Sequence, residues 1–103
     1  MTRRIAHSSK DANHDEIVET FRALGCSVVE TNLPPVAGFP DSLVGLLKKT
    51  HLVEIKSLDT AYGRRGLNAN QCAFAQEWRG SPVHTVTTRD EAIALVQNWR
   101  RAA

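Results

Sequence analysis

The chain has little of what marks several specialised protein classes. Its two cysteines, Cys26 and Cys72, stand alone without CxxC spacing or nearby histidine pairs. They give neither a disulfide framework nor a zinc-finger pattern, so we expect two reduced, mostly packed thiols. The apolar run 43–47 is far shorter than the roughly 20 residues that span a bilayer. No apolar signal segment follows Arg3 and Arg4, and we therefore expect a cytoplasmic protein.

The chain also lacks a strong excess of either charge. Its 13 lysines and arginines nearly balance its 11 acidic residues, for a formal net charge of +2. This value is too small to indicate a nucleic-acid partner, and ordinary solvated surface explains any single basic cluster. The cations are nevertheless grouped, which keeps a nucleic-acid interface open. The groups are Arg3, Arg4 and Lys10, then Lys48 and Lys49, then Arg64 and Arg65, and finally Arg100 and Arg101.

The length of 103 residues suits a single hydrophobic core. An apolar content of 42% with 23% charged residues is typical of a globular protein and not of a disordered one. We therefore expect one domain over residues 1–103.

Hydrophobic periodicity predicts helices that interrupt strands. The segment "DANHDEIVETFRALG" predicts an amphipathic helix, since Ile17, Phe21 and Leu24 recur at helical spacing. "CSVVET" predicts a strand and the proline-rich "NLPPVAGFP" a loop. A hairpin follows, with strands over 41–47 and 50–57. Its turn at Lys48 and Lys49 should be distorted or longer, because neither residue favours positive φ.

The C-terminal part continues the alternation. "NANQCAFAQEWRG" predicts a helix capped by Asn68, with Gln71 completing a capping box. "VHTVT" predicts a fourth strand, and Thr88 with Glu91 forms a second capping-box pattern before the helix "AIALVQNW". The order helix, three strands, helix, strand, helix favours an α/β fold with a mixed sheet flanked by helices.

Three charged residues in the hairpin need an explanation, because buried charges are costly unless they are paired or bound to a metal. Side chains alternate along a strand, so Glu54 and Lys56 point to one face. With the turn at 48–49, Leu43 lies opposite Glu54 and Asp41 lies opposite Lys56. Asp41 shares the charged face only if the loop has an even number of residues.

Such a face suits a divalent metal ion. Two converging carboxylates, Asp41 and Glu54, fit Mg²⁺, which takes oxygen ligands and keeps several waters. The backbone carbonyl of Ile55 can add an oxygen, and Lys56 can orient or deprotonate a metal-bound water. This would be a hydrolytic site for phosphodiesters. An ordinary cross-strand pair of Asp41 and Lys56 beside a solvated Glu54 remains the alternative.

The same residues resemble a known signature. "FPDSLVG" followed by "HLVEIK" resembles the PD-(D/E)XK nuclease motif, with 12 residues between Asp41 and Glu54. Residues 11–96 resemble the small phage-type VRR-NUC nucleases, relatives of archaeal Holliday-junction resolvases. The matching segments, in order, are "NHDEIVETFRALGCSV", "FPDSLVGLLKKTHLVEIK", "NANQCAFAQEWRG" and "PVHTVTTRDEAIALV". The resemblance implies a restriction-endonuclease-like αβββαβ core in a bacterial or phage-encoded protein.

It also implies a cofactor and residue roles. The cofactor would be Mg²⁺, with Mn²⁺ as a substitute. Asp41 and Glu54 would be metal carboxylates and Lys56 the catalytic lysine. Glu16 would complete the metal shell and Gln71 would line the site. From the residues alone, Glu16 is an exposed carboxylate in a first helical turn and Gln71 a capping residue.

The remaining polar residues give further predictions. If the register of the first helix differs, Asp15 or Glu19 would replace Glu16. The four histidines, His7, His14, His51 and His84, lack HExxH or HNH spacing, so we expect surface or packed rings. The best phosphate-contact candidates, at opposite ends of the third strand, are Lys48, Lys49, Arg64 and Arg65.

These observations predict a Mg²⁺-dependent endonuclease for duplex or branched DNA. Family geometry implies a 5′-phosphate product and a homodimer, with the last helix or the "LPPVAGF" loop as interface. A catalytically inactive nuclease-fold module that binds DNA is the first alternative. A structural protein with a solvated charged face is the second. Metal-dependent cleavage would separate them.

Overall fold

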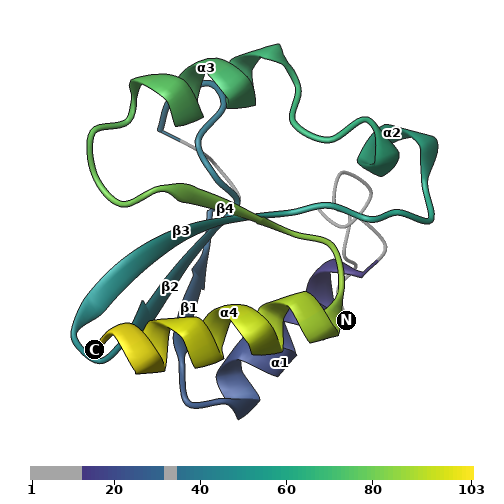
Figure 1. Cartoon of the computed structure of the whole chain (residues 1–103). Helices are drawn as coiled ribbons and strands as arrows, with labels where there is room; N and C mark the ends of the chain where they lie inside the picture. The colour runs from purple at the N-terminus through teal and green to yellow at the C-terminus, as the bar shows by residue number, and fades with distance from the viewer. Residues whose placement is uncertain (1–12, 32–34) are drawn as a thin grey trace, which may run out of the picture.

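The computed structural model describes residues 13–31 and 35–103, which form a four-stranded mixed sheet with helices on both faces (Figure 1). The elements are α1 (His14–Ala23), β1 (Ser27–Glu30), β2 (Ser42–Leu46), β3 (Lys49–Ile55), α2 (Ala61–Arg64), α3 (Ala69–Glu77), β4 (Val83–Val86) and α4 (Arg89–Ala102). The expected α/β class and element order are confirmed, with α2 as an addition. No helix in the described part of the chain is long and apolar enough to cross a membrane. Arg3, Arg4, His7, Lys10 and residues 33–34 of the "LPPVAGF" loop lie outside it.

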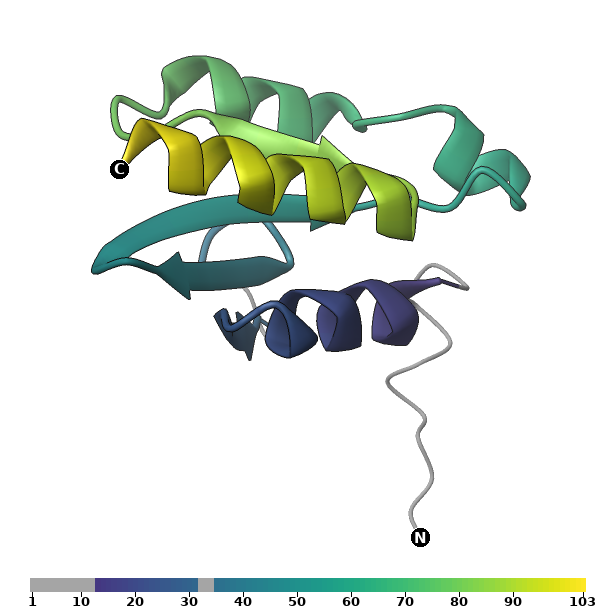
Figure 2. The ribbon, with the colours of Figure 1, turned by 60° about the horizontal axis from the view of Figure 1, so that its bottom comes forward.

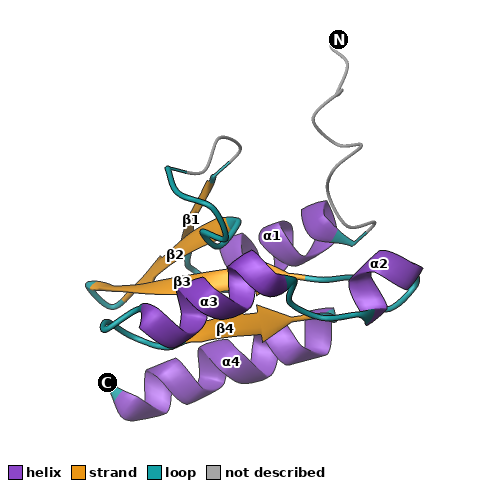
Figure 3. Ribbon diagram, turned by 90° about the horizontal axis from the view of Figure 1, so that it is seen from above, coloured by secondary structure: helices purple, strands orange, loops and turns teal. Residues whose placement is uncertain are grey.

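The strands lie in the order β1-β2-β3-β4 (Figure 3). β1, β2 and β3 pair antiparallel, whereas β4 pairs parallel to β3 after the connection through α2 and α3. The parallel ladder pairs Glu54 with Thr85 and Ile55 with Val86, and the Lys56 N–H extends it by donating to the Val86 carbonyl. β3 is therefore held on both sides at the end that carries the charged residues.

The turn between β2 and β3 differs from the prediction. Leu46 pairs with Lys49, so Leu47 and Lys48 form a tight two-residue turn one position earlier than expected. Both turn residues have positive φ, 53° at Leu47 and 66° at Lys48. Residue preferences do not predict this turn, because neither leucine nor lysine favours the left-handed region.

The shifted turn changes which residues lie opposite each other on β2 and β3. It leaves each side chain on the face of the sheet that was predicted for it. Ser42 lies opposite Val53, and the same register continued by one residue brings Asp41 opposite Glu54. The predicted partner of Asp41, Lys56, is thus displaced by two residues. Because the loop still has an even number of residues, Asp41, Glu54 and Lys56 keep the shared face that the prediction required.

Two substitutions in the turn should relieve the backbone strain that its positive φ angles impose. A type I′ hairpin turn needs positive φ at both central residues and strongly prefers Asn-Gly. We expect Leu47→Asn combined with Lys48→Gly to raise the free energy of unfolding by about 1–2 kcal/mol, measured by urea denaturation. Leu47 is 50% exposed, so the change sacrifices little packing. Leu47→Ala, which keeps the unfavourable φ, is the control and should give no gain. An equally stable double variant would contradict the expectation.

The hydrophobic core lies between the sheet and the pair α1 and α4 (Figure 2). Its buried members are Ile17, Val18, Phe21, Cys26, Val44, Leu46, Val53, Ile55, Val86, Ala92 and Val96. Trp99 closes one end by stacking on His51 at 3.7 Å between ring centroids. Burial lowers the pKa of His51 and that of His84, which favours neutral rings there. Of the two thiols, Cys26 is packed as expected but Cys72 is exposed.

α3 lies on the opposite face of the sheet and buries none of its own residues (Figure 1). Its predicted capping box, Asn68 with Gln71, is confirmed. Two contacts tie the helix to the loop before β2. Phe74 meets Phe39 edge-on at 5.4 Å, and a Cβ on Gly38 would lie 2.1 Å from the Asn70 carbonyl oxygen. Only glycine allows this approach.

The cap of α4 follows the prediction in part. The Thr88 hydroxyl accepts from the Glu91 N–H, as expected. The Glu91 carboxylate also accepts from the N–H and the hydroxyl of Thr87, one residue before the cap. These hydrogen bonds lower the pKa of Glu91.

Candidate active site at the end of the hairpin

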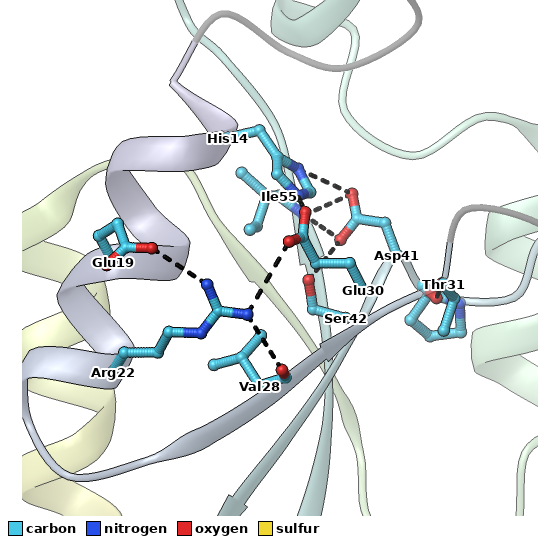
Figure 4. A network of polar contacts seen from close by, with 10 residues as sticks. His14, Glu19, Arg22, Val28, Glu30, Thr31, Asp41, Ser42 and Ile55 are labelled. Carbon is cyan, nitrogen blue, oxygen red and sulfur yellow. Dashed lines mark hydrogen bonds and ion pairs between the residues drawn. The ribbon is translucent and has the colours of Figure 1, made fainter. Parts of the chain in front are cut away.

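The three charged residues of the hairpin lie together at its open end. Asp41 stands just before β2, where the Thr31 N–H donates to its carbonyl at 2.9 Å and the Thr31 hydroxyl donates to the buried Pro40. The Ile55 N–H reaches both carboxylate oxygens of Asp41 at 3.3 Å (Figure 4). The loop and β3 thereby fix the Asp41 carboxylate beside Glu54.

Glu54 and Lys56 are both buried, with 5% and 2% of their surfaces exposed. The Lys56 Nζ lies 3.9 Å from Glu54 Oε2, so the ammonium compensates the buried carboxylate. Gln71 Nε2 donates to the same oxygen at 2.8 Å. The alternative with a solvated Glu54 and an Asp41–Lys56 pair is therefore wrong.

Gln71 caps α3 and also contacts Glu54. Its Oε1 accepts from the Asn68 N–H at 2.9 Å and so completes the cap of α3. Its Nε2 meanwhile binds Glu54. One side chain thus joins the first turn of α3 to the charged end of β3.

The surroundings of Asp41 disfavour the ionised form of its carboxyl group. Its pKa is raised to about 7, first by burial and second by the negative charge of Glu54. His14, the Ile55 N–H and the Ser42 hydroxyl oppose this shift without cancelling it. Two facing carboxylates of this kind would be stabilised by a cation placed between them.

His14 is the residue that sequence reasoning missed. It is 3% exposed, and its Nε2 lies 2.9 Å from Glu30 Oε1 while its Nδ1 lies 3.9 Å from Asp41 Oδ2 (Figure 4). A signal was present, since His14 precedes Ile17, Val18 and Phe21 at the i, i+3, i+4 and i+7 spacing of the buried helix face. The ring is packed, which agrees with the expectation of a surface or packed histidine, but its carboxylate partners were not predicted.

Glu16 is not brought into this site. Its side chain is 61% exposed and lies 3.9 Å from Arg89 Nε, in a cleft with Asn13, Ser57 and Thr87. The helix turns Glu16 about 200° away from His14, because successive residues are about 100° apart. The named substitutes do not replace it, because Asp15 is exposed and Glu19 pairs with Arg22 at 3.0 Å.

The chain was also compared with known proteins. No protein-family model, curated protein or solved structure matched it. The functional interpretation therefore rests on the residues and their geometry, together with the resemblance of the motifs.

The four basic candidates for phosphate contact are all exposed and form two separate pairs. Lys48 and Lys49 stand at the hairpin turn, and Arg64 and Arg65 at the end of α2. β3, whose seven residues span roughly 20 Å, lies between the two pairs in the chain. Arg64 also donates to the Leu58 carbonyl at 3.0 Å. The two pairs are therefore too far apart to grip one phosphate together.

The donor set fits a hard cation better than a closed structural metal site. Among the described residues, no three His, Cys, Asp or Glu side chains are arranged to hold one ion. Mg²⁺ does not need such a cage, because it binds through one or two carboxylates and keeps several waters. Asp41 and Glu54 supply that pair. Burial and, second, the negative charge of Glu54 raise the pKa of Asp41, and a divalent ion would offset the repulsion between the two carboxylates.

Proposed function

We propose that the protein is a metal-dependent DNA endonuclease that hydrolyses phosphodiester bonds in duplex or branched DNA. The observation that carries the proposal is the convergence of Asp41, Glu54 and the buried Lys56 at one end of the hairpin. The resemblance to PD-(D/E)XK and VRR-NUC nucleases supports it, because the same three residues fall on the signature. The proposal includes the assignment of this sheet to the αβββαβ core of that family.

Each residue has a role in the proposed reaction. Asp41 and Glu54, with the Ile55 carbonyl as a further oxygen, would hold Mg²⁺ or, in its place, Mn²⁺. When bound, the ion would polarise the scissile phosphate and acidify a water. Lys56, held beside Glu54, orients that water and offsets negative charge at the phosphate. Gln71 keeps the Glu54 carboxylate in place. In-line attack would leave a 5′-phosphate.

The exposed lysine and arginine pairs would direct DNA to this site. Lys48 and Lys49 on one side, with Arg64 and Arg65 on the other, offer contacts to phosphates and none designed for base edges. Binding would be sensitive to salt and largely independent of sequence. One subunit would cut one strand, and we expect a homodimer to cut both.

Incubation with branched, flapped and linear DNA in Mg²⁺, Mn²⁺ or EDTA tests the function. We expect metal-dependent cleavage that falls at least about 100-fold in Glu54→Gln and in Lys56→Met. The exposed Glu19→Gln is the control and should retain full activity. Equal cleavage by wild type and Glu54→Gln would refute the enzyme, and DNA binding without cleavage in either metal would favour the inactive module.

A further inference from the structure

A hollow of about 420 Å³ lies where β2 turns into β3, at the end of the sheet away from α2 (Figure 3). Its volume falls within the range of about 300–1,000 Å³ that is common for ligand sites. The hollow is separate from the proposed active site, because neither Asp41 nor Glu54 lines it. The lining residues that matter here are Gly25, Ser27, Gly45, Lys48, Lys49 and Thr50.

Three strands supply the floor of the hollow. Ser27 of β1 lies opposite Gly45 of β2, which lies opposite Thr50 of β3, so the three residues share one face of the sheet. Gly45 has no side chain, which leaves a gap between two exposed hydroxyl residues. An added Cβ on Gly45 would enter this gap, 3.7 Å from Ser27 Cβ. The floor therefore offers two hydroxyl donors around a space for a small ligand group.

The hollow is also positively charged. Lys48 and Lys49 line it and are exposed, and within residues 13–31 and 35–103 neither has an ion-pair partner. Arg100 adds a third cation, because its Nη2 would lie 3.4 Å from a Cβ added to Gly25. No aspartate or glutamate is among the described residues that line the hollow. Such a site attracts an anion, and a phosphate group can accept from both the lysines and the hydroxyls.

The turn that forms one wall of the hollow supports a binding role. Lys48 has a φ of 66°, a conformation for which glycine is preferred in a tight hairpin turn. Residues held in such conformations are often found at ligand-binding positions. Glycine at this position would relieve the strain but would remove an ammonium group from the hollow. Lys48 therefore lowers the stability of the turn and adds to the affinity of the hollow for anions.

The hollow and the proposed active site lie on the same face of the sheet. Side chains alternate along a strand, so Thr50 and Glu54 of β3 point to one face, about 13 Å apart along the strand. Successive nucleotides of a DNA strand rise by about 3.4 Å, so this distance corresponds to about four nucleotides. A DNA strand that is cut at Glu54 can therefore place another of its phosphates in the hollow.

We propose that this hollow binds a backbone phosphate of the DNA, about four nucleotides from the phosphate that is cleaved, without a metal ion. Lys48 and Lys49 bind the phosphate oxygens, and Ser27 and Thr50 donate to them from the floor. The inference rests on the proposed function for the identity of the ligand. It adds a second contact that sets how far the DNA must extend from the cleaved bond.

Nuclear magnetic resonance with inorganic pyrophosphate in EDTA tests the hollow in the absence of DNA. We expect saturable shifts of the backbone N–H signals of Gly25, Gly45 and Thr50. Lys48→Gln should weaken pyrophosphate binding about 5–10-fold. Arg79→Gln removes an exposed charge outside the hollow and should leave the affinity within about 2-fold of the wild type. Shifts that do not saturate, or equal affinities of the two variants, would overturn the proposal.

Two further variants separate binding from folding. Lys48→Gly should raise the midpoint of thermal unfolding, because it relieves the turn, and should still weaken pyrophosphate binding about 5–10-fold. Gly45→Ala should fold as the wild type does, because its Cβ would make only ordinary contacts. It should weaken binding at least about 3-fold, because the methyl group occupies the floor. Wild-type affinity in either variant would show that the hollow is not the phosphate site.

Duplexes of graded length test the distance to the cleaved bond. Shortening the DNA on one side to fewer than about four nucleotides should lower kcat/KM at least about 5-fold in the wild type. Lys48→Gln has lost the contact, so the same shortening should change its kcat/KM by less than about 2-fold. An equal length dependence in both proteins would contradict the proposed contact.

The two proposals can fail separately. Pyrophosphate binding that duplex DNA displaces, without cleavage of any DNA, would support the hollow and refute the nuclease. Metal-dependent cleavage by a protein that binds no pyrophosphate would leave the nuclease standing and refute the hollow. Displacement of pyrophosphate by free nucleotides but not by duplex DNA would also refute a DNA phosphate as the ligand.

Discussion

Asp41→Asn is expected to raise the free energy of unfolding at about pH 8 by about 2–4 kcal/mol and to abolish the proposed cleavage. The folded pKa of Asp41 is about 7, against 3.8 for an unperturbed aspartate. Between these values the unfolded chain has released the proton that the folded chain still holds. Wild-type stability therefore falls as the pH rises from about 4 to about 7 and then levels off. Asparagine stays neutral and avoids this loss.

Urea denaturation of wild type and Asp41→Asn at several pH values, in EDTA, measures the effect. The stability difference should be small near pH 4, grow towards pH 7 and then stay constant. The exposed Asp59→Asn is the control and should show no such growth. Adding Mn²⁺ should stabilise the wild type at about pH 8 and leave Asp41→Asn unchanged. A difference that does not vary with pH would show that the facing carboxylates are not its source.

Gly38→Ala should strongly disrupt the placement of α3. Gly38 has a φ of 83°, and its missing Cβ would lie 2.1 Å from the Asn70 carbonyl oxygen. Alanine must therefore push away the start of α3 as well as adopt an unfavourable backbone conformation. We expect a loss of at least about 2 kcal/mol in stability. Because Gln71 follows Asn70, its hydrogen bond to Glu54 should be lost and cleavage should fall.

Gly66→Ala is a matched control for this variant. Gly66 has a similar φ of 76°, but nothing lies within 4 Å of its added Cβ. Gly66→Ala should lower the free energy of unfolding by about 1 kcal/mol, through the backbone conformation alone, and should leave Gln71 in place. Urea denaturation, together with proteolysis of α3 and the cleavage rate, compares the two. Equal effects would mean that the contact at Gly38 does not position the helix.

Two kinds of feature were predictable from the sequence: those that follow from hydrophobic periodicity, and those that depend only on whether the hairpin loop has an even number of residues. The buried face of α1 and the cap at Asn68 follow from local patterns, which tertiary packing does not override here. The shared face of Asp41 and Glu54 was predictable because a register change of two residues leaves side-chain alternation intact. The cross-strand partner was not predictable, because it depends on which two residues form the turn.

One wrong prediction and one unpredicted set of contacts have separate physical causes. The turn was misplaced because the hairpin imposes positive φ on Leu47 and Lys48 against their own preference. The contacts of His14 were not predicted because its partners lie far from it in the sequence: Glu30 ends β1 and Asp41 precedes β2. Contacts across such sequence distances are set by the packing of α1 on the sheet, which no local pattern encodes.

The sheet topology also has a consequence for folding kinetics. β2 and β3 are joined by two residues, whereas β4 reaches β3 only after the long connection through α2 and α3. Closing the shorter loop costs less entropy, so the hairpin should assemble first. The repulsion between Asp41 and Glu54 then arises before the folding barrier is crossed and slows folding more than it speeds unfolding. An ion bound between them would accelerate the folding of its own site.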